Sequence, residues 1–124
     1  MLILDKDVVD NKLFFNFFNL DGYEPEYYLL YLTNRMTLVE HLFLIPSIDV
    51  TVNYLRSISF NLSEVDVDTL RTGTHYDYKL YYISDTTNIG DLPQLLSDNE
   101  DNLYDFGLLY VKGEENIIVD KVYI

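Results

Sequence analysis

Alternation of apolar and polar residues with a period of two is the feature of this sequence that most constrains its fold. From Thr74 to Tyr82, successive residues fall into two sets. Successive side chains of a β-strand point to opposite faces, so the pattern predicts a strand with one buried face. Residues 54–62 alternate in the same way and predict a second such strand. The facing sets are Tyr76, Tyr78, Leu80 and Tyr82 against His75, Asp77, Lys79 and Tyr81, and Tyr54, Arg56, Ile58, Phe60 and Leu62 against Leu55, Ser57, Ser59 and Asn61.

Further strands are predicted where β-branched and aromatic residues gather between turn residues. The turn at 112–116 predicts a terminal hairpin that pairs Leu108–Lys112 with Ile117–Tyr123. Helical character is confined to Asp91–Leu96, where an N-cap Asp and a proline in the first turn predict one short turn of helix. The additional predicted strands are Lys12–Asn19, Tyr27–Asn34, Leu38–Ile45, Leu108–Lys112 and Ile117–Ile124.

The number and spacing of these strands indicate an all-β, antiparallel β-sandwich of about seven strands. The chain has 124 residues, which suits one domain spanning residues 1–124. Residues 1–20 are predicted to form an N-terminal strand or arm that contacts a partner.

Charge and cysteine content exclude several classes of function. There are 21 Asp and Glu against 8 Lys and Arg, for a net charge of −13. Such a chain repels phosphate backbones and anionic lipids, so we expect neither nucleic acid nor membrane as a partner. No apolar run approaches the roughly 18–20 residues of a membrane helix, and no secretory signal is expected at the N-terminus. The absence of cysteine excludes disulfides, thiolate metal sites and cysteine nucleophiles.

Catalytic chemistry finds little support in the sequence. His41 and His75 are the only histidines, and neither belongs to a recognisable catalytic motif. Acid-rich segments at 64–68 and 98–102 offer oxygen ligands of the kind that calcium takes, but a solvated acidic loop explains them equally well. We therefore expect no enzymatic activity, no catalytic residue, no cofactor and no metal.

The segment Leu70-Arg71-Thr72-Gly73-Thr74-His75-Tyr76 precedes the alternating strand. The pattern Leu-x-x-Gly-Thr-x-Tyr resembles the start of strand F in fibronectin type III and related immunoglobulin-like domains. The resemblance implies an immunoglobulin-like sandwich in which Tyr76 forms a tyrosine corner and Leu70 fills the core beneath it, with Gly73 in the turn.

Two predicted strands do not alternate. Phe14 and Phe18 lie on the face opposite Leu13 and Phe15, and residues 27–32 are apolar on both faces. Either the chain's own loops or a partner subunit must cover the second face. The twelve tyrosines favour a partner, because a phenol combines apolar area with a hydroxyl that tolerates water. The predicted partner-binding residues are Phe14, Phe18, Tyr28 and Tyr31, although the period alone does not say which face is outward.

The segments Tyr76–Tyr82 and Phe106–Glu114, with Tyr28–Asn34 before them, form an aromatic strand pattern. This pattern is similar to small β-rich virion proteins of crAss-like and related tailed phages of Bacteroidota. The resemblance implies a non-enzymatic structural subunit, foremost an auxiliary (decoration) protein present in many copies on the major capsid protein. It implies a virion location after assembly in the host cytoplasm. The alternatives are a neck or tail component of the same particle, or a carbohydrate-binding module.

Overall fold

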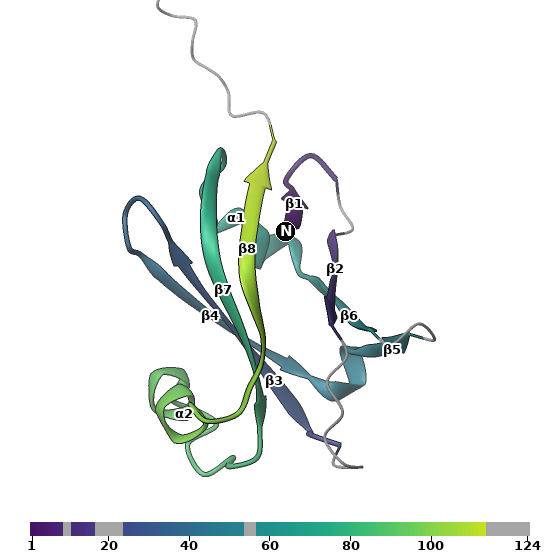
Figure 1. The fold of residues 1–124 in the computed structure, drawn as a ribbon, viewed down its shortest axis with the longest axis vertical. Helices are drawn as coiled ribbons and strands as arrows, with labels where there is room; N and C mark the ends of the chain where they lie inside the picture. The colour runs from purple at the N-terminus through teal and green to yellow at the C-terminus, as the bar shows by residue number, and fades with distance from the viewer. Residues whose placement is uncertain (9–10, 17–23, 54–56, 114–124) are drawn as a thin grey trace, which may run out of the picture.

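The computed structural model describes residues 1–8, 11–16, 24–53 and 57–113, which form mainly β-strands (Figure 1). None of the helices in these residues is long and apolar enough to span a membrane. In chain order the elements are β1 (Leu2–Asp5), β2 (Asn11–Asn16), β3 (Tyr27–Asn34), β4 (Glu40–Pro46), the 3-10 helix η1 (Ser47–Asp49), β5 (Thr51–Asn53), β6 (Ser57–Leu62), α1 (Glu64–Asp68), β7 (Thr74–Ile83), α2 (Leu92–Asp98) and β8 (Leu103–Lys112).

The larger sheet has five strands in the order β1-β8-β7-β3-β4. Its pairs are antiparallel except at the edge, where β1 runs parallel to β8. The prediction of a β-rich fold is confirmed, but the prediction that all strands pair antiparallel is wrong, because β1 and β8 run parallel. The described residues hold eight strands, and the large sheet is mixed. β1 was missed because four residues are too few to establish a period, and it is anchored by Leu4, which is fully buried.

The smaller sheet has the order β2-β6-β5 and shares one buried cluster with the larger sheet. The contact between the sheets centres on Phe15 of β2. Its ring stacks on Phe60 of β6 at a centroid distance of 5.0 Å and meets the ring of Tyr78 of β7 edge-on at 5.6 Å. The small sheet contributes Leu13, Phe15, Ile58, Phe60 and Leu62 to this core.

The alternation predicted for residues 74–82 and 54–62 is largely confirmed. In β7, Tyr76, Tyr78 and Leu80 are buried, whereas His75, Asp77 and Lys79 are exposed. In β6, Ile58, Phe60 and Leu62 are buried as predicted, but Ser59 of the opposite set is buried too. Residues 54–56 of that prediction lie outside the described part of the chain.

Helix α2 covers one end of the large sheet on the face opposite the main core (Figure 1). There Leu95 packs in a second buried cluster with Leu29 of β3 and Tyr81 and Ile83 of β7. The helix begins as predicted: the side chain of Asp91 accepts a hydrogen bond from the backbone of Gln94, with a proline in the first turn. The end of β3 that carries Leu29 is therefore covered by the chain itself, so the alternative of self-coverage holds for that part of the strand.

The remaining strand predictions agree with the structure to different extents. β3 matches its prediction, whereas β4 begins at Glu40 because the preceding residues form a turn. β2 ends at Asn16, and the continuation to Asn19 lies outside the described residues, as does the predicted strand 117–124. Residues 109–112 of β8 pair with β1 on one side, and residues 109–111 pair with β7 on the other, which leaves no free edge there for the predicted terminal hairpin.

Candidate interaction surfaces

The four predicted partner-binding residues do not share one surface. Phe14 is 53 % exposed on the outer side of β2, while Phe18 lies outside the described residues. Tyr31 is half-buried on the outer face of β3. Tyr28 is only 7 % exposed, and its ring meets that of Tyr104 edge-on at 5.7 Å inside the main core. The prediction that Tyr28 contacts a partner is therefore corrected: the fold turns this residue inward.

The residues assigned a structural role lie together at the start of β7. The hydroxyl of Tyr76 accepts a 2.8 Å hydrogen bond from the backbone N–H of Arg71, and both Tyr76 and Leu70 are buried in the main core. Gly73 has a φ of +79°, a conformation that glycine adopts without a steric penalty. The chain thus makes a tight turn before β7, and the tyrosine ties the strand back to it.

The turn between β3 and β4 presents three exposed apolar side chains close together in the sequence. Met36, Leu38 and Val39 are 80 %, 71 % and 52 % exposed, respectively. Together with Arg35 and Thr37 they form a projecting hairpin tip, residues 35–39. Sequence reasoning marked this segment only as a turn followed by a strand. The sequence signal that could have marked this segment as a surface site is its run of apolar residues inside a turn, where polar residues are usual.

Buried Asn34 holds the hairpin tip in one shape. Its Oδ1 accepts hydrogen bonds from the backbone N–H groups of Met36 at 2.8 Å and Thr37 at 3.0 Å. Its Nδ2 donates to Oγ1 of Thr74 at 3.3 Å, and the Arg35 backbone N–H donates to the carbonyl of His75 at 3.0 Å. These bonds fasten the tip to β7, so its apolar side chains are presented on a fixed backbone.

Leu38 occupies a strained backbone conformation within this tip. Its φ is +62°, in the left-handed region, where a residue with a Cβ is disfavoured by about 1–2 kcal/mol. Non-glycine residues in such conformations cluster at binding sites, where the surrounding structure enforces them. Here the enforcing contacts include the hydrogen bond from the Leu38 backbone N–H to the carbonyl of Asn34 at 2.8 Å.

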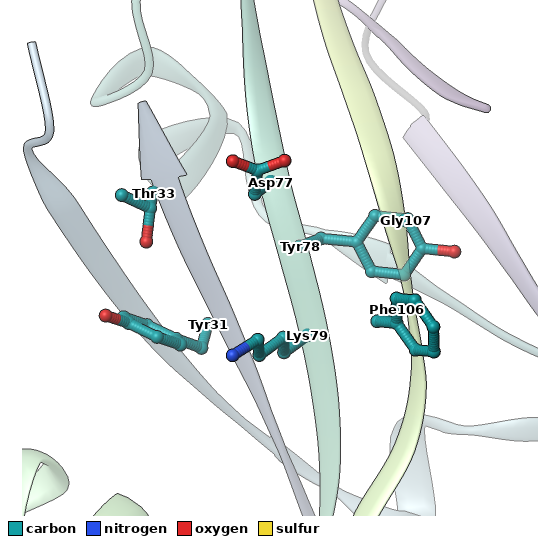
Figure 2. A pocket seen from close by; sticks show the side chains of 7 residues that line it. All are labelled: Tyr31, Thr33, Asp77, Tyr78, Lys79, Phe106 and Gly107. Atoms are coloured by element: carbon teal, nitrogen blue, oxygen red, sulfur yellow. The ribbon is translucent and has the colours of Figure 1, made fainter. Parts of the chain in front are cut away.

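A shallow groove of about 320 Å³ lies on the outer face of the large sheet, beyond the part that α2 covers (Figure 2). One cross-strand row, Tyr31 of β3, Lys79 of β7 and Phe106 of β8, runs across it. Figure 2 shows the two aromatic rings on opposite sides of Lys79. Thr33 and Asp77 form the adjacent row. We call this site the outer groove; its full lining is Tyr31, Thr33, Asp77, Tyr78, Lys79, Phe106 and Gly107.

Tyr78 packs beside the outer groove and joins the two sheets. Its hydroxyl donates a 3.2 Å hydrogen bond to Oδ2 of Asp105, and the same oxygen accepts from the backbone N–H of Asn16 of β2 at 3.3 Å. A Cβ at Gly107 would lie 3.0 Å from the Tyr78 ring, so glycine leaves the space that this ring occupies. Burial, together with the charge of Asp105 and its hydrogen bond, raises the pKa of Tyr78 to about 12.

The raised pKa values of two buried tyrosines, Tyr28 and Tyr78, predict a loss of folding stability at alkaline pH. Burial is the largest cause of the raised pKa at both Tyr28 and Tyr78, and it brings the pKa of Tyr28 to about 12 as well. An unfolded tyrosine loses its proton near pH 10, so between about pH 10 and 12 the unfolded state releases protons that the folded state retains. The stabilisation is present below pH 10 and lost as the pH rises through 12. Urea unfolding midpoints should therefore fall above pH 10, and the fall should be smaller in Tyr78→Phe. An identical decline in both proteins would contradict this assignment.

The two histidines do not meet. His41 lies on the core side of β4, where its ring contacts those of Phe43 and Tyr76, and burial lowers its pKa. His75 lies on the outer face of β7, with its ring 4.8 Å from that of Tyr110. Within the described residues, neither imidazole forms a hydrogen bond with a hydroxyl group, so no Ser, Thr or Tyr nucleophile is paired there with either histidine.

The acid-rich segments are organised by side chains other than carboxylates. Residues 64–68 form helix α1, capped by the hydroxyl of Ser63, which accepts from the backbone N–H of Asp66 at 3.1 Å. In residues 98–102, buried Asn99 makes most of the contacts. The described part of the chain holds no group of three or more His, Cys, Asp or Glu side chains suited to a metal ion.

Comparison of the chain with models of known protein families, with curated proteins and with solved structures finds no match.

Proposed function

We propose that this chain is a non-enzymatic structural subunit of a tailed-phage virion, an auxiliary (decoration) protein bound to the major capsid protein. The single observation that carries a binding role is the hairpin tip, which holds three exposed apolar side chains on a fixed and strained backbone. The aromatic strand pattern, which spans most of residues 27–114, supports the choice of particle.

The hairpin tip suits a protein partner with an apolar cleft. Exposed apolar side chains on a rigid support bury area on binding without a large cost in conformational entropy. The overall charge of −13 argues against insertion of the tip into an anionic membrane. A preformed capsid lattice offers such clefts between subunits, and binding there requires no contact with DNA.

We further propose that the fold is a variant of the immunoglobulin-like sandwich. The contact between the Tyr76 hydroxyl and the Arg71 backbone, with Leu70 beneath it, supports this interpretation. The two sheets packed on one core support it as well. The parallel edge strand β1 would then be an addition to that arrangement.

Quantitative mass spectrometry of gradient-purified phage particles tests the proposed function. A copy number near that of the major capsid protein would support a decoration protein. A copy number in the range of a neck or tail component would replace the capsid site with one of those sites. Absence of the chain from purified particles would overturn the virion role.

Substitution of Leu38 by glycine is expected to separate the stability of the hairpin tip from its binding. Glycine relieves the left-handed strain but gains freedom in the unfolded chain, for a net stabilisation of about 0.5–1 kcal/mol. The same change removes an apolar contact, so we expect incorporation into particles to fall on the order of tenfold. Urea unfolding and particle mass spectrometry measure the two effects.

A matched control for Leu38→Gly is Ile48→Ala, which truncates an exposed apolar side chain of η1 away from the tip. This variant should be incorporated at the normal level. Normal incorporation of Leu38→Gly would show that the tip is not the contact, and equal loss in both variants would point to a general effect of surface apolar residues.

A further inference from the structure

We propose that the outer groove binds a neutral oligosaccharide of pyranose sugars. This inference goes beyond the proposed virion role and does not depend on it. It rests on the cross-strand row Tyr31–Lys79–Phe106 and the polar row beside it.

The two aromatic side chains have the placement that sugar rings require. Tyr31 and Phe106 both pair with Lys79, so all three side chains project from the same face of the sheet. Neighbouring strands are separated by about 4.8 Å, so the two aromatic positions are about 10 Å apart. That distance is comparable to the length of a disaccharide. Phe106 is 68 % exposed, which leaves its ring available to the apolar C–H face of a pyranose.

The polar groups between and beside the rings match the hydroxyl edges of a sugar. Lys79 and Asp77 are exposed, Thr33 is partly buried, and all three line the groove. The Lys79 ammonium forms no ion pair with any described residue, whereas Asp77 pairs with Arg35 at 3.5 Å across an exposed surface. An ammonium donates, a carboxylate accepts and a threonine hydroxyl does both, so together they can bind hydroxyl groups in either role.

Charge favours a neutral glycan over acidic ligands and over an apolar protein surface as the occupant of the outer groove. The chain carries a net charge of −13, which disfavours the approach of uronic acids, sulfated sugars or acidic peptides. An apolar protein surface laid over the groove would bury the Lys79 ammonium without a counter-ion, which is costly. Sugar hydroxyls replace the water around that ammonium with equivalent hydrogen bonds. A neutral oligosaccharide therefore satisfies both the rings and the charge.

Isothermal titration of the full chain with cellohexaose, maltohexaose, chitohexaose and the acidic hexagalacturonate tests the proposal. We expect at least one neutral hexasaccharide to bind with a Kd of about 1 mM or tighter, with little dependence on salt. Phe106→Ala should weaken that binding by about tenfold or more. Phe14→Ala, which removes an exposed phenylalanine from the other sheet, should leave it unchanged.

Three results would overturn the proposal. They are the absence of binding by all three neutral sugars, binding that Phe106→Ala does not weaken, and binding of hexagalacturonate alone. The test is independent of the virion role, because Phe106→Ala should still be incorporated into particles at the normal level. Thermal unfolding of Phe106→Ala should match that of the unchanged chain, so that lost binding is not a consequence of lost fold.

Discussion

Phe15→Ala is expected to lower the free energy of unfolding by about 3–5 kcal/mol, the cost of truncating a fully buried phenylalanine. Phe15 is 1 % exposed, and its ring contacts Phe60 of the small sheet and Tyr78 of the large one. The substitution would leave a cavity at the point where the two sheets meet. For a domain whose total stability is about 5–15 kcal/mol, this is a large fraction of the whole.

The adjacent Phe14 is the matched control for Phe15. It has the same side chain on the same strand, but it faces outward, so Phe14→Ala should cost no more than about 1 kcal/mol. Urea unfolding followed by tyrosine fluorescence measures both variants. Equal losses of stability in the two variants would mean that the two side chains are equally buried. A larger loss at Phe14 would mean that Phe14, and not Phe15, faces the core.

Asn99→Ala is expected to cost about 2–4 kcal/mol, because it leaves several backbone groups without their partners. The Asn99 Oδ1 accepts from the backbone N–H groups of Ser84 and Asp85, both at 3.0 Å. Its Nδ2 donates to the carbonyls of Asp85 at 3.0 Å and Leu95 at 2.9 Å. These bonds join the end of α2 to the segment that follows β7.

The loss at Asn99 should be local in character. Release of α2 would expose Leu29, Tyr81 and Ile83, which this helix covers, before the main core opens. Hydrogen exchange should therefore rise first in α2 and at the covered end of β3. Asn61→Ala, at an exposed position on β6, is the control and should change stability by no more than about 0.5 kcal/mol. Unaltered exchange in α2 of Asn99→Ala would contradict the role assigned to this amide.

Asn99 also shows what composition alone could not reveal about the acid-rich segment 98–102. Residues 98–102 are rich in Asp and Glu, and composition alone draws attention to the carboxylates. In the fold, the Asp98 carboxylate accepts hydrogen bonds from Asn88 and Gln94, and the buried contacts come from the amide of Asn99. An amide both donates and accepts, so it can join backbone groups of both kinds, which a carboxylate cannot do.

The candidate sites were partly accessible from the sequence. The alternation in β7 placed Asp77 and Lys79 together on one face. It could not bring Tyr31 and Phe106 to either side of Lys79, because those residues come from strands far apart in the chain. The hairpin tip was recognised only as a turn. Its rigidity comes from Asn34, whose bond to Thr74 joins segments that are distant in sequence.

The sequence by itself determined the β-rich character of the chain, the two faces of β7 and the capped start of α2. These features follow from local backbone geometry: a period of two within one strand, and a side chain that bonds to a backbone group three residues away. The tertiary structure decided that Tyr28 points inward, that β1 joins β8 in parallel and that α2 covers β3. Those outcomes depend on which surfaces meet, and a strand's own pattern sets its two faces without choosing which of them is buried.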